Sequence, residues 1–597
     1  MNRTLRALAT AALAALFATT ASAGPAAAPA APKAWVVKSN ENAQLLLNVL
    51  AKYGPEGATQ LGVDGYDDKI LDLSRDQFEP SRKDTLEVVA ELERRMAAET
   101  DARVKQDLEI LINAAKDNLH TNTLNRDTYF PYIDVTGLVF GVSRGTLDPR
   151  VPKEKQASLL GRLEKYAGLA KGYRPLTELA KERTLERIKQ QPALLGPYKG
   201  QLEQDLNNAP TLIKGLKDIL AKSELKGWEK SYAALEKQLT GYNAWLAKEI
   251  MPRAAQSHLL PPAIYADNLK QFGVDVPPAE LVAKALTSFA EIRNEMQVIA
   301  GLIAKERGLP DPDYRAVIKA LKQEQIPADK VLALYEERLA KIEAAMRANR
   351  IATVPDRKSV IKLATEAETA QQPAPHMRPP RLIGNTGEYG VFVLPAGLPP
   401  DPTGKQLRYD DFSHQASTWT LTAHESRPGH EMQFANMIEA GVSTARAVFA
   451  FNSVNVEGWA LYAEAEMKPY LPLDGQLFSL QARLQRAARA FLDPMVNQDQ
   501  IQPDQVTDFL MDEVGLSEAM ATQETRRYTF NAPGQATSYF YGYQRLMETR
   551  QAAEVALRDK FDRQAFNDFV LAQGLVPPKV LRKAVMEEFV PARRAAK

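Results

Sequence analysis

Apolar residues recur at helical spacing along most of this chain of 597 residues, and that pattern constrains the fold more than any other feature. Residues 84–97 carry it at four positions, Leu86, Val89, Leu92 and Met96. The same spacing appears in residues 101–119 and 331–346. Apolar residues three or four positions apart share one face of a helix, and that face must pack against another element. The pattern predicts a large, mainly α, multi-helix fold, with a minor β element at residues 388–394 (EYGVFVL).

The domain organisation is indicated by proline-rich breaks. They fall at residues 261–262, 277–278, 373–380 and 395–402. Proline lacks the backbone donor that a helix interior needs, so such clusters end helices. We therefore divide the chain into an N-terminal helical region, residues 40–380, and a C-terminal helical region, residues 381–597. We expect the two regions to form one integrated unit.

The first 23 residues have the three parts of a secretory signal peptide. Two arginines give a positive start, residues 8–18 form a short apolar run, and Ala21-Ser22-Ala23 places small residues at the cleavage point. We expect export to the periplasm or the medium after cleavage near Ala23, with residues 24–39 as an Ala/Pro-rich linker. No later apolar run is long enough to cross a bilayer, so no membrane span is predicted.

The composition excludes several classes of function and of metal site. The 75 Lys and Arg residues nearly balance the 74 Asp and Glu residues, so the chain has no basic footprint for nucleic acid. It has no cysteine, so a cysteine nucleophile is excluded and any metal must be held by His, Asp or Glu. The sequence also contains no Gly-rich phosphate loop, dinucleotide fingerprint or Gly-x-Ser-x-Gly elbow.

Two of the six histidines, His424 and His430, lie in the segment T-A-H-E-S-R-P-G-H. The zinc motif His-Glu-x-x-His places two imidazoles one helical turn apart, with the glutamate beside them as a base. Here the spacing is two residues longer, and an unbroken helix would turn the second histidine about 120° away. Pro428 removes a helical hydrogen bond, and Gly429 adds backbone freedom. We predict a helix broken at Pro428-Gly429, so that His430 returns to His424 with Glu425 beside them.

A third ligand is expected downstream, where Glu457 and Glu464 lie in the segment N-V-E-G-W-A-L-Y-A-E. Seven residues apart on a helix, the two glutamates share a face but lie about 10 Å apart along the axis. Both cannot contact one ion whose oxygen ligands lie at about 2 Å. One is therefore a ligand and the other a supporting residue, and spacing alone does not choose between them.

Two resemblances bear on this choice. Residues 455–464 resemble the Asn-Glu-Gly-Phe-Ala segment of aminopeptidase N-type zinc enzymes, whose glutamate is the third ligand, and this favours Glu457. From about residue 40 onward the chain resembles the bacterial domain-of-unknown-function 885 family, which is placed with zinc peptidases of the thermolysin-like clan. The matching stretches are residues 58–68, 424–430, 457–464 and 533–539. One departure is Glu431, because family members often have a second histidine there.

The resemblance implies an exported zinc metallopeptidase with a peptidase-like helical fold and one zinc ion per chain, held by His424, His430 and Glu457. Two imidazoles and one carboxylate leave a position open for water, as in catalytic sites. Glu425 would take the proton from that water while a peptide substrate is cut. The alternatives are a zinc amidase acting on cell-wall peptides and a catalytically inactive helical binding protein. The sequence indicates no oligomeric state.

Other candidates lie around this expected site. Among Tyr539, Tyr541 and Tyr543, the resemblance favours Tyr539 as the oxyanion donor, although an aromatic packing stripe would have the same spacing. Arg526 or Arg527 could bind a substrate carboxylate, and we select Arg527. The alternative for either arginine is an ion pair with a glutamate of its own helix.

Three more residues are considered as supports for the ligands. Glu464 and Asp410 are candidates to orient a ligand histidine through a hydrogen bond. His414, ten residues before His424, could serve in the same way, but we expect it at the surface.

Overall fold

The computed structural model describes residues 33–595 except 373, 386, 389 and 396–409. The expected signal peptide, residues 1–23, lies outside the described residues. Residues 24–32 of the expected linker also lie outside them. The fold is mainly α with a minor β element, as predicted.

The first described helix begins earlier than predicted, so the linker assignment is wrong for residues 34–39. Helix α2 spans Ala34–Tyr53. Val36 is buried, and the Ser39 hydroxyl donates a hydrogen bond of 2.5 Å to the Asp107 carboxylate. The burial of Val36 and the contact of Ser39 with α5 (Ala102–Thr128) stabilise the first turns of α2. The Ala/Pro-rich composition ends before these turns.

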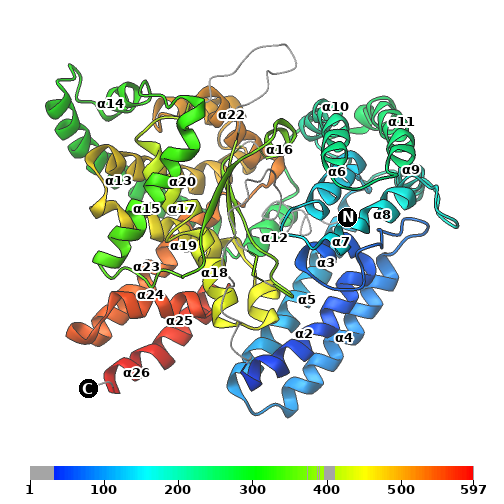
Figure 1. Cartoon of the computed structure of the whole chain (residues 1–597), viewed down its shortest axis with the longest axis horizontal. Helices are drawn as coiled ribbons and strands as arrows, with labels where there is room; N and C mark the ends of the chain where they lie inside the picture. The colour runs from blue at the N-terminus through cyan, green and yellow to red at the C-terminus, as the bar shows by residue number, and fades with distance from the viewer. Residues whose placement is uncertain (1–32, 373, 386, 389, 396–409, 596–597) are drawn as a thin grey trace.

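The N-terminal half is mainly helical, with α2 to α11 on the right-hand side of Figure 1 and α13, α14 and α15 on the left. Its helices are α2, α3 (Pro55–Leu61), α4 (Phe78–Ala98), α5 (Ala102–Thr128), α6 (Val135–Thr146), α7 (Lys153–Ala157), α8 (Leu159–Tyr166), α9 (Leu176–Gln190), α10 (Lys199–Lys222), α11 (Glu229–Trp245), α12 (Pro262–Phe272), α13 (Pro278–Arg307), α14 (Tyr314–Leu321), α15 (Val331–Ala348) and α16 (Glu366–Gln371).

The C-terminal half is also helical. Its helices are α17 (Ser417–Glu425), α18 (His430–Ala440), α19 (Ser453–Met467), α20 (Leu473–Asn497), α21 (Pro503–Asp512), α22 (Glu518–Arg526), α23 (Thr537–Leu557), α24 (Arg563–Ala572), α25 (Pro578–Ala584) and α26 (Val590–Ala595). Single turns of 3₁₀ or π helix connect several of them. Within the described residues, no helix combines the length and the apolar character needed to cross a membrane.

The three helices predicted from periodicity are present as α4, α5 and α15. Asp101 starts α5, because its carboxylate accepts hydrogen bonds from the backbone amides of Arg103 and Val104. In α4 the apolar positions Val89 and Leu92 are buried. The spacing of the apolar residues therefore identified helix faces that pack against neighbouring helices.

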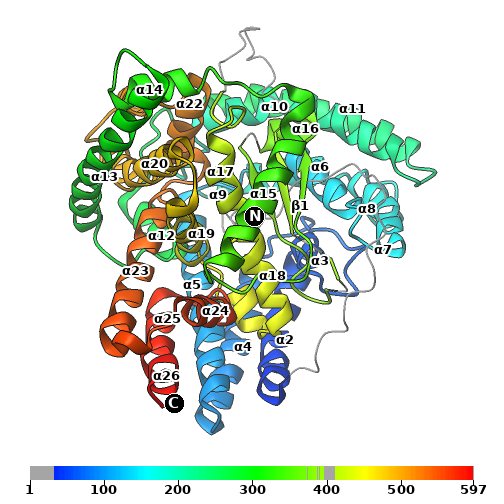
Figure 2. The same cartoon turned by 60° about the vertical axis from the view of Figure 1, so that its left-hand side comes forward.

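The three strands form a small mixed sheet in the order β1-β3-β2. Strand β3 (Val391–Leu394) confirms the predicted β element, and it pairs in parallel with β1 (Val360–Leu363) and antiparallel with β2 (His376–Arg378). Phe392 faces α15 and α17, where it packs with Tyr335 and Leu421. Both views place α15 beside the strands (Figures 1 and 2).

The largest buried apolar cluster crosses the boundary between the two halves of the chain. It joins α13 and α14 to α20, α21 and α23. Phe289 of α13 meets Phe491 of α20 edge-to-face, with ring centroids 5.5 Å apart. A second cluster is built almost wholly from residues 130–254, so the N-terminal helices have a core of their own.

Candidate metal centre

The helix that carries His424 is broken where the sequence predicts. α17 ends one residue after His424, and α18 starts at His430. A Cβ on Gly429 would lie 1.9 Å from the carbonyl oxygen of His424, so only glycine permits this approach. The indole of Trp459 donates a hydrogen bond of 2.9 Å to the carbonyl of Pro428. This bond holds the connection between α17 and α18 against α19.

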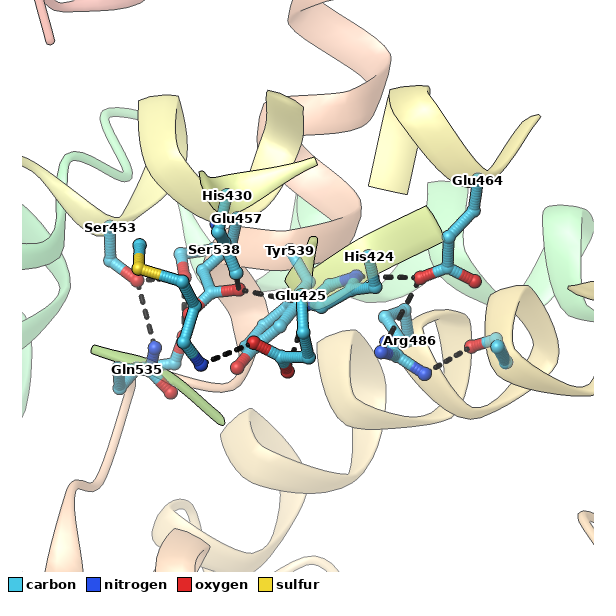
Figure 3. Close-up of polar contacts among 12 residues, drawn as sticks. His424, Glu425, His430, Ser453, Glu457, Glu464, Arg486, Gln535, Ser538 and Tyr539 are labelled. Carbon is cyan, nitrogen blue, oxygen red and sulfur yellow. Dashed lines mark hydrogen bonds and ion pairs between the residues drawn. The ribbon is translucent and has the colours of Figure 1, made fainter. Parts of the chain in front are cut away.

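The break brings the three predicted ligands together (Figure 3). The Nε2 atoms of His424 and His430 lie 3.6 Å and 3.4 Å from one oxygen of Glu457, its Oε2. One ligand atom of each residue lies within 4.8 Å of those of the other two. The two imidazole rings are nearly perpendicular, with centroids 4.7 Å apart. Helices α17, α18 and α19 thus each direct one side chain to a common point.

The atoms at this point suit a divalent cation. Glu457 Oε2 is buried and has no hydrogen-bond partner of good geometry among the described residues. A buried carboxylate oxygen without a donor is costly, and a bound cation would satisfy it. Two imidazole nitrogens and one carboxylate oxygen form a donor set that zinc binds while leaving one position open. The residues therefore fit a zinc ion.

Glu464 contacts the other side of the His424 ring. Its Oε1 accepts a hydrogen bond of 2.7 Å from Nδ1 of His424, and its Oε2 accepts one of 2.6 Å from Thr420. The Arg486 guanidinium lies 3.5 Å from the same carboxylate. The hydrogen bond to Glu464 orients the His424 ring, with Nδ1 toward Glu464 and Nε2 toward Glu457. Of the two glutamates on α19, only Glu457 joins the converging atoms.

The charged side chains of the site shift the pKa values of two of the proposed ligands. Burial disfavours a charged His424, but its contacts with Glu457 and Glu464 outweigh that effect and raise its pKa to about 9. Burial raises the pKa of the Glu457 carboxyl, but the two histidines hold that pKa well below its usual range. The site therefore concentrates negative charge on Glu457, which favours a cation.

Glu425 lies beside the ligands without joining them. Its Oε1 is 4.0 Å from Nε2 of His424, and its Oε2 accepts a hydrogen bond of 2.6 Å from the backbone amide of Met377 in β2. Burial raises the pKa of the Glu425 carboxyl above its ordinary value. A carboxylate held rigidly and with a raised pKa is suited to accept a proton. Met377 was not predicted, because a backbone amide leaves no trace in side-chain patterns.

Tyr539 approaches the site from α23. Its ring lies nearly parallel to that of His424, with centroids 6.3 Å apart, and its hydroxyl accepts a hydrogen bond of 2.8 Å from Arg527. α19 and α23 pack backbone against backbone, since a Cβ on Gly458 would lie 2.5 Å from the carbonyl carbon of Gly542. This close packing places Tyr539 next to Glu457, as Figure 3 shows.

Arg527 is held among side chains of its own neighbourhood. Its Nε donates a hydrogen bond of 2.9 Å to Gln535, and its Nη1 lies 3.5 Å from Glu524, as the ion-pair alternative expects. Glu524 pairs more closely with Arg489, through two hydrogen bonds of 2.6 Å and 2.7 Å. Arg489 also lies over the Tyr539 ring, 4.4 Å from its centroid. The sequence did not single out Arg489, which has no motif of its own.

A large cleft opens onto the site. Its volume is about 2940 Å³, and its walls include the three ligands, Glu425 and Tyr539. Helices of both halves of the chain line it, among them α5 and α20. Pockets for single small molecules hold about 300–1,000 Å³. The cleft is therefore large enough for an extended, polymeric ligand.

The sequence matches the family described as bacterial protein of unknown function (DUF885) over residues 55–585. The chain belongs to this family. Among curated proteins there is no match.

Solved structures share the fold of this family member along nearly its whole length. A Colwellia psychrerythraea protein has a TM-score of 0.72 at 19% identity, and the alignment covers 93% of this chain and 99% of that one. A Shewanella oneidensis protein has a TM-score of 0.69 at 18% identity, covering 93% of this chain and 100% of that one. Both are described as a "putative lipoprotein", the second as one of unknown function. At these identities the likeness concerns the fold.

The structure corrects the expectation for His414. It is fully buried, not at the surface, and its ring packs on Phe478 with centroids 4.4 Å apart. Burial and the nearby Lys322 lower its pKa to about 3. The polar flanking sequence gave no sign of this burial, which comes from contacts with α14 and α20.

Asp410 and Glu431 each contact a basic side chain. The carboxylate of Asp410 lies 3.4 Å from the Lys322 ammonium group. Glu431 accepts a hydrogen bond of 2.9 Å from Arg427 and is fully buried. The residue that follows His430 in this family member therefore has a structural contact, and His430 itself faces Glu457.

Proposed function

We propose that this protein is an exported zinc metallopeptidase. The observation that carries the proposal is the convergence of His424, His430 and Glu457, whose ligand atoms lie within 4.8 Å of one another. Glu425 is fixed beside them by the Met377 amide, in a cleft large enough for a peptide. An inactive binding protein would have no need of such an arrangement.

Each residue of the site has a role in the proposed reaction. Zinc, when bound by the three ligands, supplies Lewis acidity that activates water and polarises the scissile carbonyl. Glu425 takes the proton from the attacking water and passes it to the leaving amine. The raised pKa of Glu425 favours this exchange, because its carboxyl can hold the proton between the two steps. Glu464 keeps His424 oriented.

Tyr539 and Arg527 form a polar part of the cleft wall near His424 in this proposal. The Tyr539 hydroxyl already accepts a hydrogen bond from Arg527, so its own proton is free to be donated to an oxyanion. Arg527, Arg489 and Arg486 all surround the Tyr539 ring, with guanidinium carbons 4.4–5.7 Å from its centroid. Such a cationic wall suits the carboxylate of a peptide substrate, with Arg527 as the proposed contact.

Export is part of the proposal. The tripartite segment at residues 1–23 supports it, and so does the description of two solved structures of the same fold as a "putative lipoprotein". Cell fractionation with an antibody tests this point. Recovery of the protein in the cytosol would contradict it.

The experiment that tests the function uses the mature protein with defined peptides and, separately, with cell-wall fragments. We expect cleavage of peptides, loss of activity with a chelator and recovery with zinc. Glu425→Gln should lower kcat by at least about 100-fold, whereas the exposed Glu336→Gln should leave kcat unchanged. Cleavage of cell-wall fragments alone would favour the amidase, and cleavage that persists in Glu425→Gln would refute the proposed base.

A further inference from the structure

A second group of charged side chains lies on the face of the sheet that is turned away from α15 and α17. The register pairs Lys362 of β1 and His376 of β2 with the same residue of β3, Val393, so the two side chains project from one face. Arg378 follows His376 by two residues and lies on that face as well. Phe392 projects from the opposite face, toward Tyr335. The sheet thus separates this group from the packing around α17.

Arg144 of α6 is the member of this group whose entire guanidinium lacks a hydrogen-bond partner among the described residues. It is 1% exposed, and none of its three guanidinium nitrogens has a hydrogen-bond partner within the described parts of the chain. Of the two nearest carboxylates, Asp148 is paired with other arginines, and Glu368 has one oxygen, Oε1, without a hydrogen-bond partner among the described residues. Asp148 lies 2.9 Å from Arg150 and 3.0 Å from Arg378, and Glu368 accepts a hydrogen bond of 2.8 Å from the amide of Thr365.

The group carries an excess of positive charge. Three guanidinium groups, those of Arg144, Arg150 and Arg378, are set against the carboxylates of Asp148 and Glu368. The Lys362 ammonium group is 3.6 Å from Glu368 and has no hydrogen-bond partner among the described residues. A guanidinium does not lose its proton in a protein, so the excess remains at every pH at which the protein folds. A buried charge without a counter-charge is strongly unfavourable.

Water molecules would be a poor substitute for a counter-charge beside Arg144. All the N–H groups of Arg144 would need separate water molecules in the protein interior, and none of these would neutralise the charge. His376 does not compensate either, because burial lowers its pKa to about 4 and keeps it neutral. A single small anion satisfies two parallel N–H groups and the charge together.

We propose that Arg144, with Lys362 and Arg378, binds a small inorganic anion of the size of chloride between α6 and the sheet. Arg144 does not line the large cleft and is buried, so a bulky organic anion has no access to it. His376 of this group lines the cleft, as does Thr369, which follows Glu368, so a small ion would enter from that side. The site shares no residue with the proposed metal centre.

The anion site has a structural connection to that centre. The residue after His376 is Met377, whose amide holds Glu425. An anion that neutralises the face carrying His376 and Arg378 stabilises β2, and with it the orientation of Glu425. Occupancy of the site is therefore expected to stabilise the whole protein first and to affect Glu425 only through β2.

Thermal unfolding of the mature protein tests the proposal, at constant ionic strength, in sodium chloride, sodium sulfate or sodium gluconate. We expect a saturating rise of Tm in chloride of about 2 °C over gluconate. Arg144→Met should abolish the rise, and the exposed Arg253→Met should keep it. Equal Tm in chloride and gluconate would overturn the anion site. A larger rise in sulfate than in chloride would overturn the choice of a halide.

Two further measurements keep the test decisive if Arg144→Met does not fold. Lys362→Met, at the edge of the group, should raise the chloride concentration at half-saturation by about tenfold, since it removes one of the attracting charges. Crystals soaked in bromide should show an anomalous peak beside Arg144. An unchanged half-saturation in Lys362→Met, or only water density beside Arg144, would refute the proposal.

Discussion

Glu464 shows how a residue that does not reach the ion can control a ligand. Its carboxylate is buried, and it joins the His424 imidazole to Thr420 and Arg486. A hydrogen bond to the second nitrogen of a ligand histidine fixes the ring and raises its basicity. Sequence spacing left Glu457 and Glu464 as alternatives, and the three-dimensional path of α19 past His424 separates their contacts.

We predict that Glu464→Gln weakens zinc binding by about 10- to 100-fold, because the His424 ring loses its charged acceptor. Competition with a chromogenic chelator measures the affinity. Glu466→Gln is the matched control, since Glu466 lies two residues further along α19 and pairs with Arg550 instead. Equal affinity in the two variants would show that Glu464 does not support the ligand.

His414 gives a prediction about acid stability. Its folded pKa of about 3 is below the unfolded value of 6.5. The neutral folded form therefore contributes stability above pH 6.5 that is lost as the pH falls toward 3, at up to about 1.4 kcal/mol per pH unit. In His414→Gln the fall in Tm between pH 7 and pH 4.5 should be smaller than in the wild type. The same fall in both proteins would contradict this assignment.

The residues that the sequence identified are those with a chemical signature. His424, Glu425, His430 and Glu457 stand in motifs whose spacing has a chemical reason, and the structure brings them together. Met377 could not be identified in this way, because its backbone amide makes the contact.

At the scale of elements, the site depends on the break between α17 and α18. A regular helix would direct the two histidines apart. Because α17 ends at Glu425 and α18 begins at His430, the segment with Pro428 and Gly429 lets the second histidine turn back toward the first. The break could be predicted because proline and glycine act locally. Its geometry could not, since it depends on the close approach of Gly429 to the end of α17 and on Trp459 from α19.

Gly429→Ala should therefore damage the site. The added methyl group would lie 1.9 Å from the His424 carbonyl oxygen, so α17 and α18 must separate. We expect a loss of about 1–3 kcal/mol in stability and a fall in zinc affinity of at least about tenfold. Gly301→Ala in α13 is the control, because a Cβ there meets nothing within 4 Å. A Gly429→Ala protein that keeps the wild-type Tm and zinc affinity would contradict the account.

Only one of the three strands could be predicted from the local sequence. β3 was predicted from its apolar run, but β1 and β2 were not. β2 lies within a proline-rich stretch, which local rules assign to a loop, and it is an edge strand, where flanking proline is tolerated. Its formation depends on pairing with β3, and such non-local pairing is not encoded in its own residues.

At the scale of the whole molecule, the two halves of the chain share one core. α13 packs on α20 across the boundary placed at residue 380, with Phe289 against Phe491. The solved structures align with both halves together, which shows that the arrangement is common to the fold. The sequence alone could place the breaks, but it could not show which apolar faces meet across them.

A fragment of residues 381–597 should therefore fail to fold alone, although it contains all three proposed ligands. Its α20 would expose the apolar face that α13 covers. We expect no cooperative thermal transition by circular dichroism and no stoichiometric zinc binding. Coexpression with residues 33–380 should restore both properties. A cooperative melt of the isolated fragment would contradict the single shared core.

The measurement that tests the central claim most directly is the zinc content of the purified mature protein by mass spectrometry. We predict close to one zinc ion per chain. His424→Ala, His430→Ala and Glu457→Ala should each lose it while retaining a cooperative melt, and Glu425→Gln should keep it. A wild-type protein without zinc after reconstitution, or ligand variants that still hold one ion per chain, would contradict the account.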